Sequence, residues 1–294
     1  MERNKFQRAV SWAGSKKVFN FLPDREYLKI MYWARMSQRL DLDNPQTLNE
    51  KVQWLKLNDY QENYTNIVDK YEVRSYIKYV LGEEYLIPLV GGPWTDFSQI
   101  DIGLLPNRFV LKTTHDSGGV VVCTDKQKLD IGRAKKKLEK SLKNNFYWLG
   151  RERPYKKIQP QIIAEQYLVD DGGEELKDYK ILCFNGVPQN IMVCTGRLQG
   201  GVKYYFFDLD WNFLPLNNGD EKLPIDFTLP KPKHLNEMIR VAEILSKGFK
   251  LLRVDLYEAN SRVYFGEMTL YPDSGFDTDI LPSTDINLGK KLVL

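Results

Sequence analysis

Histidine, cysteine and long apolar runs are scarce in this sequence of 294 residues. The two histidines, His115 and His234, are too few for a zinc site built on imidazole ligands. The three cysteines, Cys123, Cys183 and Cys194, stand far apart in apolar runs and lack the spacing of a metal site or of a disulfide framework. We therefore expect reduced thiols in the core of a cytoplasmic protein.

Several sequence signals are missing altogether. No apolar run reaches the roughly 20 residues that a transmembrane helix needs, and the first residues, MERNKFQRAV, lack the apolar segment of a signal peptide. Both absences favour a cytoplasmic location. The GxxxxGK[ST] signature of P-loops and the GxGxxG signature of dinucleotide-binding folds are also absent. A nucleotide site in this chain must therefore be of another kind.

The charge is unevenly distributed along the chain. The formal net charge is +3, but residues 1–40 alone carry nine Lys or Arg against three acids. A basic end of this kind favours peripheral contact with an anionic surface, such as the inner face of a membrane or a glycan. The alternative is a solvated helical arm. The lysines at 135–137 lie on the polar face of a helical pattern without an RNA-binding motif, so we expect no nucleic-acid partner.

The apolar pattern divides the chain into a helical first part and a mixed second part. Helical spacing over 24–40 and 63–81, with a capping box that begins at Thr47, predicts a mainly helical region up to about residue 106. The segment 86–101 is rich in Gly and Pro and is expected to be a loop.

From residue 108 onward, strand-type runs are interrupted by helical patterns at 131–146 and 234–248. The expected strands are RFVLKTT, GGVVVCT, QIIAEQYLV, YKILCFNG, QNIMVCTG, VKYYFFDLD, KLLRVDLYE and RVYFGEMTL. The fold class that this order predicts is α+β, with mixed sheet and packed helices.

The last two expected strands carry two carboxylates that can face each other. If the chain reverses at about Ser261, Asp255 lies opposite Glu267 on the neighbouring strand. Opposed carboxylates repel each other unless a divalent cation bridges them, and Mg²⁺ needs only one or two carboxylates beside substrate phosphates. In any other register both acids would face solvent, and the pattern alone leaves these two interpretations open.

Basic and glycine residues accompany the acid pair. Lys112 ends the run RFVLK, Lys180 lies within DYKILCF, and Gly118 and Gly119 form a turn in KTTHDSGGVVVC. Each feature alone is typical of an ordinary strand or hairpin. Together they predict a triphosphate site, in which lysines meet phosphate oxygens, backbone N–H groups of the turn line the phosphates and the acids hold Mg²⁺.

The order of these motifs resembles the ATP-grasp enzymes and, more narrowly, the TupA-like ATP-grasp family of bacterial surface-polysaccharide gene clusters. The matching segments run from about residue 40 nearly to the C-terminus: NPQTLNEKVQWLKLND, VDKYEVRSYI, LPNRFVLKTTHDSGG, PQIIAEQYL, LKDYKILCFNG, FFDLDWN, KGFKLLRVDLYE and YFGEMTLYPDSGF. The resemblance implies an ATP-grasp fold whose two α+β subdomains, 107–164 and 165–294, grip ATP and follow a helical region at 1–106.

The resemblance also implies residue roles. Residues expected to contact ATP are Lys112, Ser117, Gly118, Gly119, Glu165, Gln166, Tyr167, Leu168 and Lys180. Expected Mg²⁺ ligands are Asp255, Glu267 and Thr269. Expected catalytic residues are Arg253, which would stabilise transferred charge, with Lys180 and His115. Expected substrate contacts are Arg197, Ser274 and Gly275.

Three positions depart from the family pattern. Thr269 stands where many ATP-grasp enzymes have Asn, and its hydroxyl is a poorer metal ligand than an amide oxygen. Asp116 and Asp273 stand where HGSGG and YPGSGF would have glycine. Aspartate tolerates the left-handed backbone conformation better than most residues, but an added negative charge beside phosphate is unfavourable.

By resemblance, the expected activity is that of an ADP-forming carboxylate–amine ligase that acts through an acyl phosphate. The expected substrates are a uronic acid on a sugar or glycan and an amino acid or small amine. The aromatic and basic segment 144–157 is a candidate for binding the anionic sugar, or else a packed helix end and loop. The alternatives are a glycosyltransferase using the DLD tripeptide at 208–210, and a non-catalytic nucleotide- or glycan-binding protein.

Overall fold

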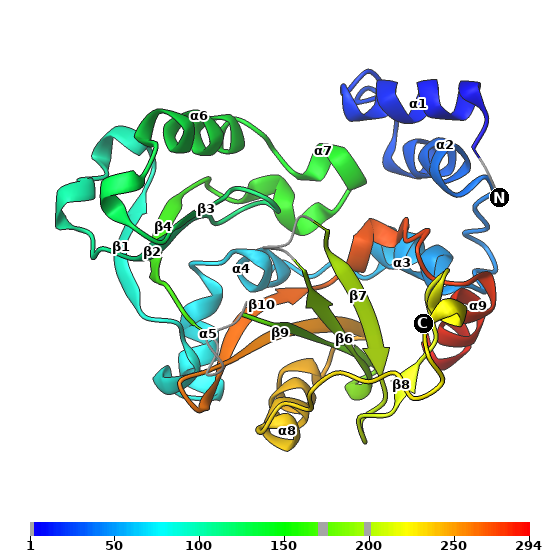
Figure 1. Cartoon of the computed structure of the whole chain (residues 1–294). Helices are drawn as coiled ribbons and strands as arrows, with labels where there is room; N and C mark the ends of the chain where they lie inside the picture. Colours follow the sequence, from blue (N-terminus) through cyan, green and yellow to red (C-terminus); the bar gives the residue numbers. More distant parts are fainter. Residues whose placement is uncertain (1–2, 170–175, 197–200) are drawn as a thin grey trace.

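Two antiparallel sheets with helices packed around them make up the protein (Figure 1). The computed structural model describes residues 3–169, 176–196 and 201–294. The helices are α1 (Lys5–Ser15), α2 (Asp24–Met36), α3 (Leu48–Asn58), α4 (Tyr64–Val68), α5 (Val73–Val80), α6 (Ile131–Leu142), α7 (Tyr147–Gly150), α8 (Leu235–Ser246) and α9 (Pro282–Lys291). The strands are β1 (Leu89–Trp94), β2 (Phe109–Thr113), β3 (Val120–Cys123), β4 (Ile162–Gln166), β5 (Asp178–Phe184), β6 (Val187–Thr195), β7 (Lys203–Phe207), β8 (Phe213–Leu214), β9 (Leu251–Ala259) and β10 (Arg262–Thr269).

The smaller sheet has the strand order β1-β4-β2-β3 and is covered by α6. Alternate residues of β2, Phe109 and Leu111, are fully buried, as expected for a strand with one face on a core. They belong to the same hydrophobic cluster as Ala134 and Leu138 of α6. The side chains on the other face of β2, among them Lys112, remain partly exposed.

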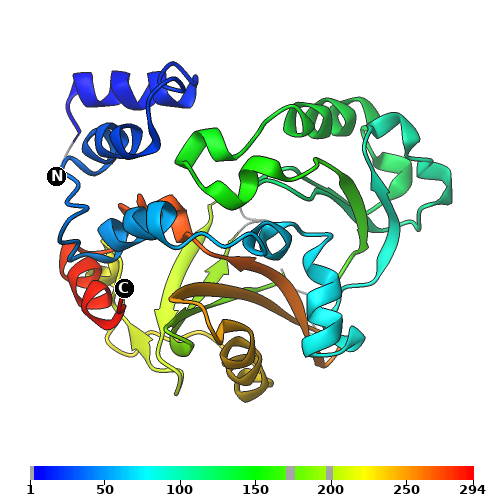
Figure 2. The same cartoon turned by 180° about the vertical axis from the view of Figure 1, so that it is seen from behind.

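The larger sheet has the order β10-β9-β5-β6-β7-β8 and packs on α8. Ile181, Ile191 and Val254 are fully buried in the same cluster as Met238 and Ala242 of α8. Because side chains alternate along a strand, the neighbours of these residues, including Lys180 and Asp255, point to the opposite face. That opposite face is turned toward the smaller sheet (Figures 1 and 2).

The N-terminal helices α1 and α2 pack on each other, and α2 also packs on α3 (Figure 2). The helix predicted over 24–40 is confirmed as α2, whose Tyr27, Leu28, Met31 and Tyr32 are fully buried. The segment 24–40 is therefore not a solvated arm, because α2 contributes to a hydrophobic core. None of the described helices is long and apolar enough to cross a membrane.

Two predictions about the helical part are wrong in detail. The pattern over 63–81 forms two helices, α4 and α5, because the Asp69 carboxylate accepts from the N–H groups of Tyr71 and Glu72 and turns the chain between them. The segment expected to be a loop contains β1, an edge strand with an irregular register opposite β4. Proline is tolerated at a sheet edge because its missing N–H faces away from the neighbouring strand.

Candidate active site

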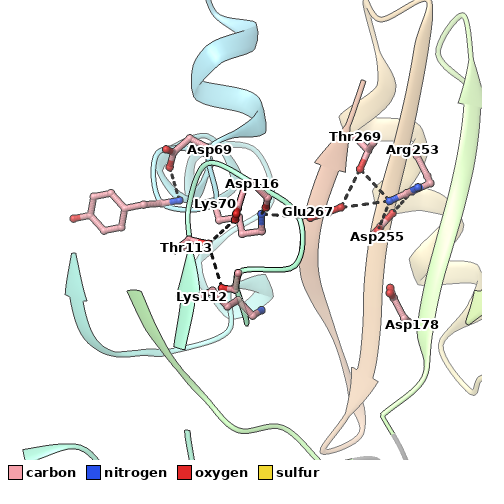
Figure 3. Close-up of polar contacts among 12 residues, drawn as sticks. Asp69, Lys70, Lys112, Thr113, Asp116, Asp178, Arg253, Asp255, Glu267 and Thr269 are labelled. Carbon is pink, nitrogen blue, oxygen red and sulfur yellow. Dashed lines mark hydrogen bonds and ion pairs between the residues drawn. The ribbon is translucent and has the colours of Figure 1, made fainter. Parts of the chain in front are cut away.

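A cleft of about 790 Å³ lies between the two sheets. Its floor is formed by β5, β9 and β10 of the larger sheet, and its opposite wall by Lys112 on β2 and the loop that follows. The segments that contain α7 and residues 271–279 close one end. Charged side chains from both sheets face this space (Figure 3).

A row of charged residues crosses three neighbouring strands of the floor. Glu267 on β10 pairs with Asp255 on β9, and Asp255 pairs with Lys180 on β5. The predicted juxtaposition of Asp255 and Glu267 is therefore confirmed, and the alternative register with both acids in solvent is wrong. The row continues with Met192 on β6 and Phe206 on β7, which also line the cleft.

The pairing of the two acids depends on a β-bulge at Gly266. The hairpin begins with a two-residue turn, Asn260-Ser261, and in that register Asp255 would face Gly266. The register shifts between Phe265 and Glu267, so that Glu267 takes the position opposite Asp255. A Cβ at Gly266 would lie 2.9 Å from the Asp255 carbonyl oxygen, so only glycine fits here.

The Asp255 carboxylate is buried and forms ion pairs with two basic side chains. Arg253 donates from Nε to Oδ1 at 2.7 Å and from Nη2 to Oδ2 at 2.9 Å, and Lys180 also donates to Oδ2. Asp178 lies 2.7 Å from Lys180 Nζ and balances the second positive charge. Burial opposes the ionisation of Lys180, but the Asp255 and Asp178 carboxylates outweigh it and raise the pKa of Lys180. Lys180 and Arg253 therefore remain cations.

Glu267 is the carboxylate of the row that opens to the cleft, with 38% of its side chain exposed. Arg253 Nη2 lies 3.3 Å from it, Lys70 Nζ lies 3.9 Å from it, and the Thr269 hydroxyl donates to it at 3.1 Å (Figure 3). Burial would raise the pKa of Glu267, but Lys70 and Arg253 outweigh burial and lower it to about 2. The cleft therefore presents an ionised carboxylate surrounded by cations.

On the opposite wall, Lys112 Nζ lies 2.6 Å from Glu165 of β4. Arg74 on α5 lies 3.4 Å from the other oxygen of the same carboxylate. Glu165 thus accepts two cations, and Lys112 lines the cleft with its charge only partly offset.

The loop between β2 and β3 is held together by Asp116. Its carboxylate accepts from the hydroxyls of Thr113 and Ser141, so the negative charge is turned into the loop. Lys70 Nζ donates to the Asp116 carbonyl oxygen at 2.5 Å and ties the loop to the region before α5 (Figure 3). The role of an aspartate beside a phosphate site, which the sequence left unexplained, is therefore to anchor the loop.

The two glycines of this loop differ in what surrounds them. Gly118 has a φ of +95° and open space where a Cβ would be, whereas a Cβ at Gly119 would collide with the Thr113 and Ser141 hydroxyls. Ser117 and Gly118 line the cleft. A loop of this kind brings backbone N–H groups close to an anion without side chains in the way.

The profile of the TupA-like ATP-grasp family matches residues 50–293, most of the chain. The chain belongs to the TupA-like ATP-grasp family. Its fold is accordingly the ATP-grasp fold, an α+β architecture with two sheets facing a common cleft. No protein of established function matches it in sequence.

Solved structures with a similar arrangement share little sequence with this ATP-grasp protein. D-alanyl-alanine synthetase A of Vibrio cholerae is 12% identical, with a TM-score of 0.47 over 82% of this chain and 68% of that one. D-alanine–D-alanine ligase of Bacillus anthracis is 16% identical, with a TM-score of 0.39 over 76% of this chain and 62% of that one. The ATP-grasp ligase PsnB, solved with minimal precursor, Mg and ADP, is 9% identical, with a TM-score of 0.39 over 96% and 73%.

Two sets of expected site residues do not line the cleft: the expected catalytic residue His115 and the expected ATP contacts 165–168. His115 is buried, and its Nε2 donates to the carbonyl oxygens of Ser141 and Asn144 behind the loop. It holds α6 to the loop and is not placed to contact phosphate. The segment Glu165–Leu168 spans the end of β4, and Leu168 packs in a small cluster with Ile87 and Tyr264. Its assignment to adenine and ribose stays a prediction.

Of the two expected substrate residues Ser274 and Gly275, Ser274 lines the cleft, whereas Gly275 is buried against α3. The Ser274 hydroxyl and carbonyl accept from Lys56 Nζ, and the Gly275 carbonyl accepts from Gln53 at 2.6 Å. Asp273, the third departure from the family pattern, has a φ of 48° and begins a left-handed turn. Aspartate does adopt the backbone conformation that this position requires. Arg197 lies outside the described residues.

Several site residues were not identified from the sequence. Lys70 and Arg74 lie in a helical pattern that gave no sign of a role. Lys70 reaches Glu267 in the cleft, and Arg74 pairs with Glu165, the partner of Lys112. Asp178, two residues before Lys180, could have been found from strand alternation, which puts both on one face. By contrast, Asp208 of the DLD tripeptide accepts three bonds from Asp210 and Asn212 within its own turn and does not line the cleft.

The cleft suits a Mg²⁺-bound polyphosphate in its donor set. The open Glu267 carboxylate shares the cleft with cations of both sheets and with Lys70, which precedes α5. Gly118 of the loop leaves space for an anion. Among the described residues no group of three His, Cys, Asp or Glu side chains is arranged to hold a metal ion. Glu267 would therefore be the principal protein ligand, with phosphate oxygens supplying further ligands, as Mg²⁺ prefers.

Proposed function

We propose that the protein is an ATP- and Mg²⁺-dependent ligase that joins a carboxylate to an amine through an acyl phosphate. We propose further that the carboxylate belongs to a uronic acid of a sugar or glycan and that the amine is an amino acid or a small amine. The pathway would be the synthesis of a bacterial capsular or cell-surface polysaccharide. Membership of the ATP-grasp family supports the ligase activity.

One observation carries the proposal: the open Glu267 carboxylate lies among cations of both sheets. Lys112 approaches from the smaller sheet, and Lys180 and Arg253 rise from the larger one. A triphosphate needs positive charge on several sides and one anionic group for its metal ion. The arrangement supplies both.

The proposed reaction proceeds in two steps. A carboxylate oxygen of the uronic acid attacks the γ-phosphorus of ATP, the bond to the bridging oxygen breaks, and ADP leaves. The amine nitrogen then attacks the acyl carbon, inorganic phosphate departs with the carboxylate oxygen, and the nitrogen loses a proton to give the amide. Bound Mg²⁺ would neutralise phosphate charge in the first step.

The residues of this chain would act by position and charge. Arg253 is fixed by Asp255 and projects toward Glu267, where it would stabilise negative charge that develops during phosphoryl transfer. Because Asp178 and Asp255 hold Lys180 as a cation, Lys180 would keep its charge when phosphate binds. Ser274 lies where the closed end of the cleft would receive the acceptor.

The test uses purified protein with Mg-ATP and a panel of uronates and amines. Release of ADP that requires both co-substrates, with an amide product detected by mass spectrometry, supports the ligase. Release of AMP, or consumption of a sugar nucleotide without ADP, would favour a glycosyltransferase or another activity. Binding of Mg-ATP with no turnover on any pair would favour the non-catalytic alternative. The ion pairs of Asp255 with Arg253 and Lys180 are the observation that favours this alternative, because they engage a carboxylate that was expected to bind Mg²⁺.

A further inference from the structure

A second cavity of about 550 Å³ adjoins the closed end of the cleft. Arg35, Asp273, Asp277 and Asp279 line both spaces. One wall of this second cavity comes from α1 and α2, and the other from the segment 276–279. The two helices lie outside residues 50–293, the part of the chain that matches the family, so one wall of the cavity comes from residues that the family profile does not include.

Arg35 on α2 is the cation at the junction of the two spaces. Its guanidinium lies 4.6 Å from the centre of the Phe276 ring. Within residues 3–169, 176–196 and 201–294 it makes no hydrogen bond or ion pair, although it is only partly exposed. The guanidinium of Arg35 has five N–H donors, and burying part of it without acceptors costs free energy. An anionic group of a ligand would satisfy them.

Trp12 on α1 presents a flat apolar surface to the same cavity, and 63% of it is exposed. It lies beside Arg8 and Ser11, which add polar groups at the rim. The C–H face of a sugar ring is apolar and its edge is polar, so an exposed indole with polar neighbours suits a saccharide.

The opposite wall supplies acceptors for hydroxyl groups. The backbone of Asp277 is fixed by Asn49, which accepts from its N–H at 2.9 Å and donates to its carbonyl at 3.1 Å. The Asp277 carboxylate accepts from the Asp279 N–H at 2.8 Å and lines the cavity. Saccharide hydroxyls donate to such carboxylates, so the anion would lie toward Arg35 and the hydroxyls toward this wall.

We propose that the second cavity binds a saccharide unit that carries an anionic group of its own, adjacent to the unit whose carboxylate reacts in the cleft. Trp12 stacks on its ring, and Arg35 pairs with its anion. The inference rests on the proposed function, and it makes the preferred substrate a saccharide with two or more anionic groups. The second anion comes either from a neighbouring uronate of an oligosaccharide or from the diphosphate of a sugar nucleotide.

The test measures binding by calorimetry, without ATP, for galacturonate, trigalacturonate and UDP-glucuronate. Wild type is compared with Arg35→Met, which keeps the packing on Phe276, and Trp12→Ala, a change at an exposed site. Arg39→Met is the matched control, because Arg39 is an exposed arginine just after α2 that lines neither space. Circular dichroism verifies that all variants are folded.

The expected result is at least tenfold tighter binding of one of the two larger ligands than of galacturonate. Both variants should abolish this preference and Arg39→Met should retain it. The ligand that shows the effect identifies the source of the second anion. Equal affinity for all three ligands, or a preference that survives both variants, would overturn the inference. ADP release that requires an amine is measured separately, with galacturonate, trigalacturonate and UDP-glucuronate each as the carboxylate. Lack of turnover with all three would count against the proposed function and would leave the measured binding preference standing.

Discussion

At the scale of single residues, the two paired acids of the cleft differ in what already surrounds them. Asp255 is 1% exposed and accepts from both Arg253 and Lys180, whereas Glu267 is open to the cleft. Asp255 holds two cations in place, and its assignment as a Mg²⁺ ligand stays a prediction. Glu267 is available to a ligand.

Exchanging each acid for its amide separates these roles. Glu267→Gln should lower ATP turnover by at least about 100-fold, because it removes the open metal ligand, while stability changes by less than about 1 kcal/mol. Asp255→Asn should cost about 3 kcal/mol, because it leaves buried cations poorly paired. Denaturant unfolding and ADP release measure the two effects. Wild-type turnover in folded Glu267→Gln contradicts the assignment.

Asp277 predicts a dependence of stability on pH. Burial, with Asp273 as a second cause, raises the pKa of Asp277 to about 6. The folded state therefore binds a proton more tightly than the unfolded state, and this contribution to stability is lost as the pH rises through about 6. Asp277→Asn should raise the free energy of unfolding by about 1 kcal/mol at pH 8, since the side chain is partly screened by solvent.

At pH 4 the same substitution should have little effect, because Asp277 is then protonated in the folded state. Urea unfolding of both proteins at pH 4 and pH 8 gives the comparison. A variant that is destabilised equally at both pH values would show that Asp277 stabilises the fold through its hydrogen bonds instead.

At the scale of elements, the bulge in β10 decides the geometry of the site. Gly266→Ala would place a Cβ 2.9 Å from both the Asp255 carbonyl oxygen and the Tyr257 ring. The hairpin must shift to relieve these contacts, and the row from Glu267 to Lys180 shifts with it. We expect a loss of about 2 kcal/mol in stability together with a severe loss of turnover. Gly132→Ala, at a helical glycine with space around it, is the control.

The Ser141 hydroxyl is one of the contacts that join the loop over the cleft to α6. Ser141→Ala removes a donor to the buried Asp116 carboxylate and should cost about 2 kcal/mol. The loosened loop should raise the KM for Mg-ATP more than it lowers kcat. Ser75→Ala, on the exposed side of α5, should change neither parameter. An unchanged KM in Ser141→Ala would show that the loop does not contact the nucleotide.

The elements themselves show what sequence patterns can predict. Alternation and capping patterns were sufficient for β9, β10 and the start of α3, whose capping box at Thr47 is present. The acid pair was predicted from a symmetric reversal at Ser261, but the real cause is a tight turn followed by a bulge, which no local pattern reveals. β1 was missed because Gly and Pro dominate it, and its strand conformation comes from pairing with β4.

Contacts between residues far apart in the sequence could not be predicted either, because no local pattern encodes them. The sequence placed His115 in a glycine-rich turn but could not show that its ring points back to the carbonyls of Ser141 and Asn144. Lys70 reaches the cleft, and Arg74 reaches Glu165, because the turn at Asp69 ends α4 early. Such positions depend on long-range packing and not on periodicity.

At the scale of the whole molecule, two sheets supply opposite halves of one site, and the N-terminal helices extend it. Charges of the smaller sheet, at Lys112, face the row on the larger sheet across the cleft. The family match begins at residue 50, so α1 and α2 are an addition to the matched part. We infer that the shared part performs phosphoryl transfer and that the added helices select the substrate.

The central claim is that a carboxylate is activated by ATP in the cleft before the amine attacks. It is tested most directly with a uronate that carries ¹⁸O in its carboxylate, incubated with Mg-ATP and the amine. An acyl phosphate transfers one carboxylate oxygen to the released phosphate, so we predict inorganic phosphate that contains ¹⁸O together with ADP and the amide. Unlabelled phosphate with amide formation would contradict the account.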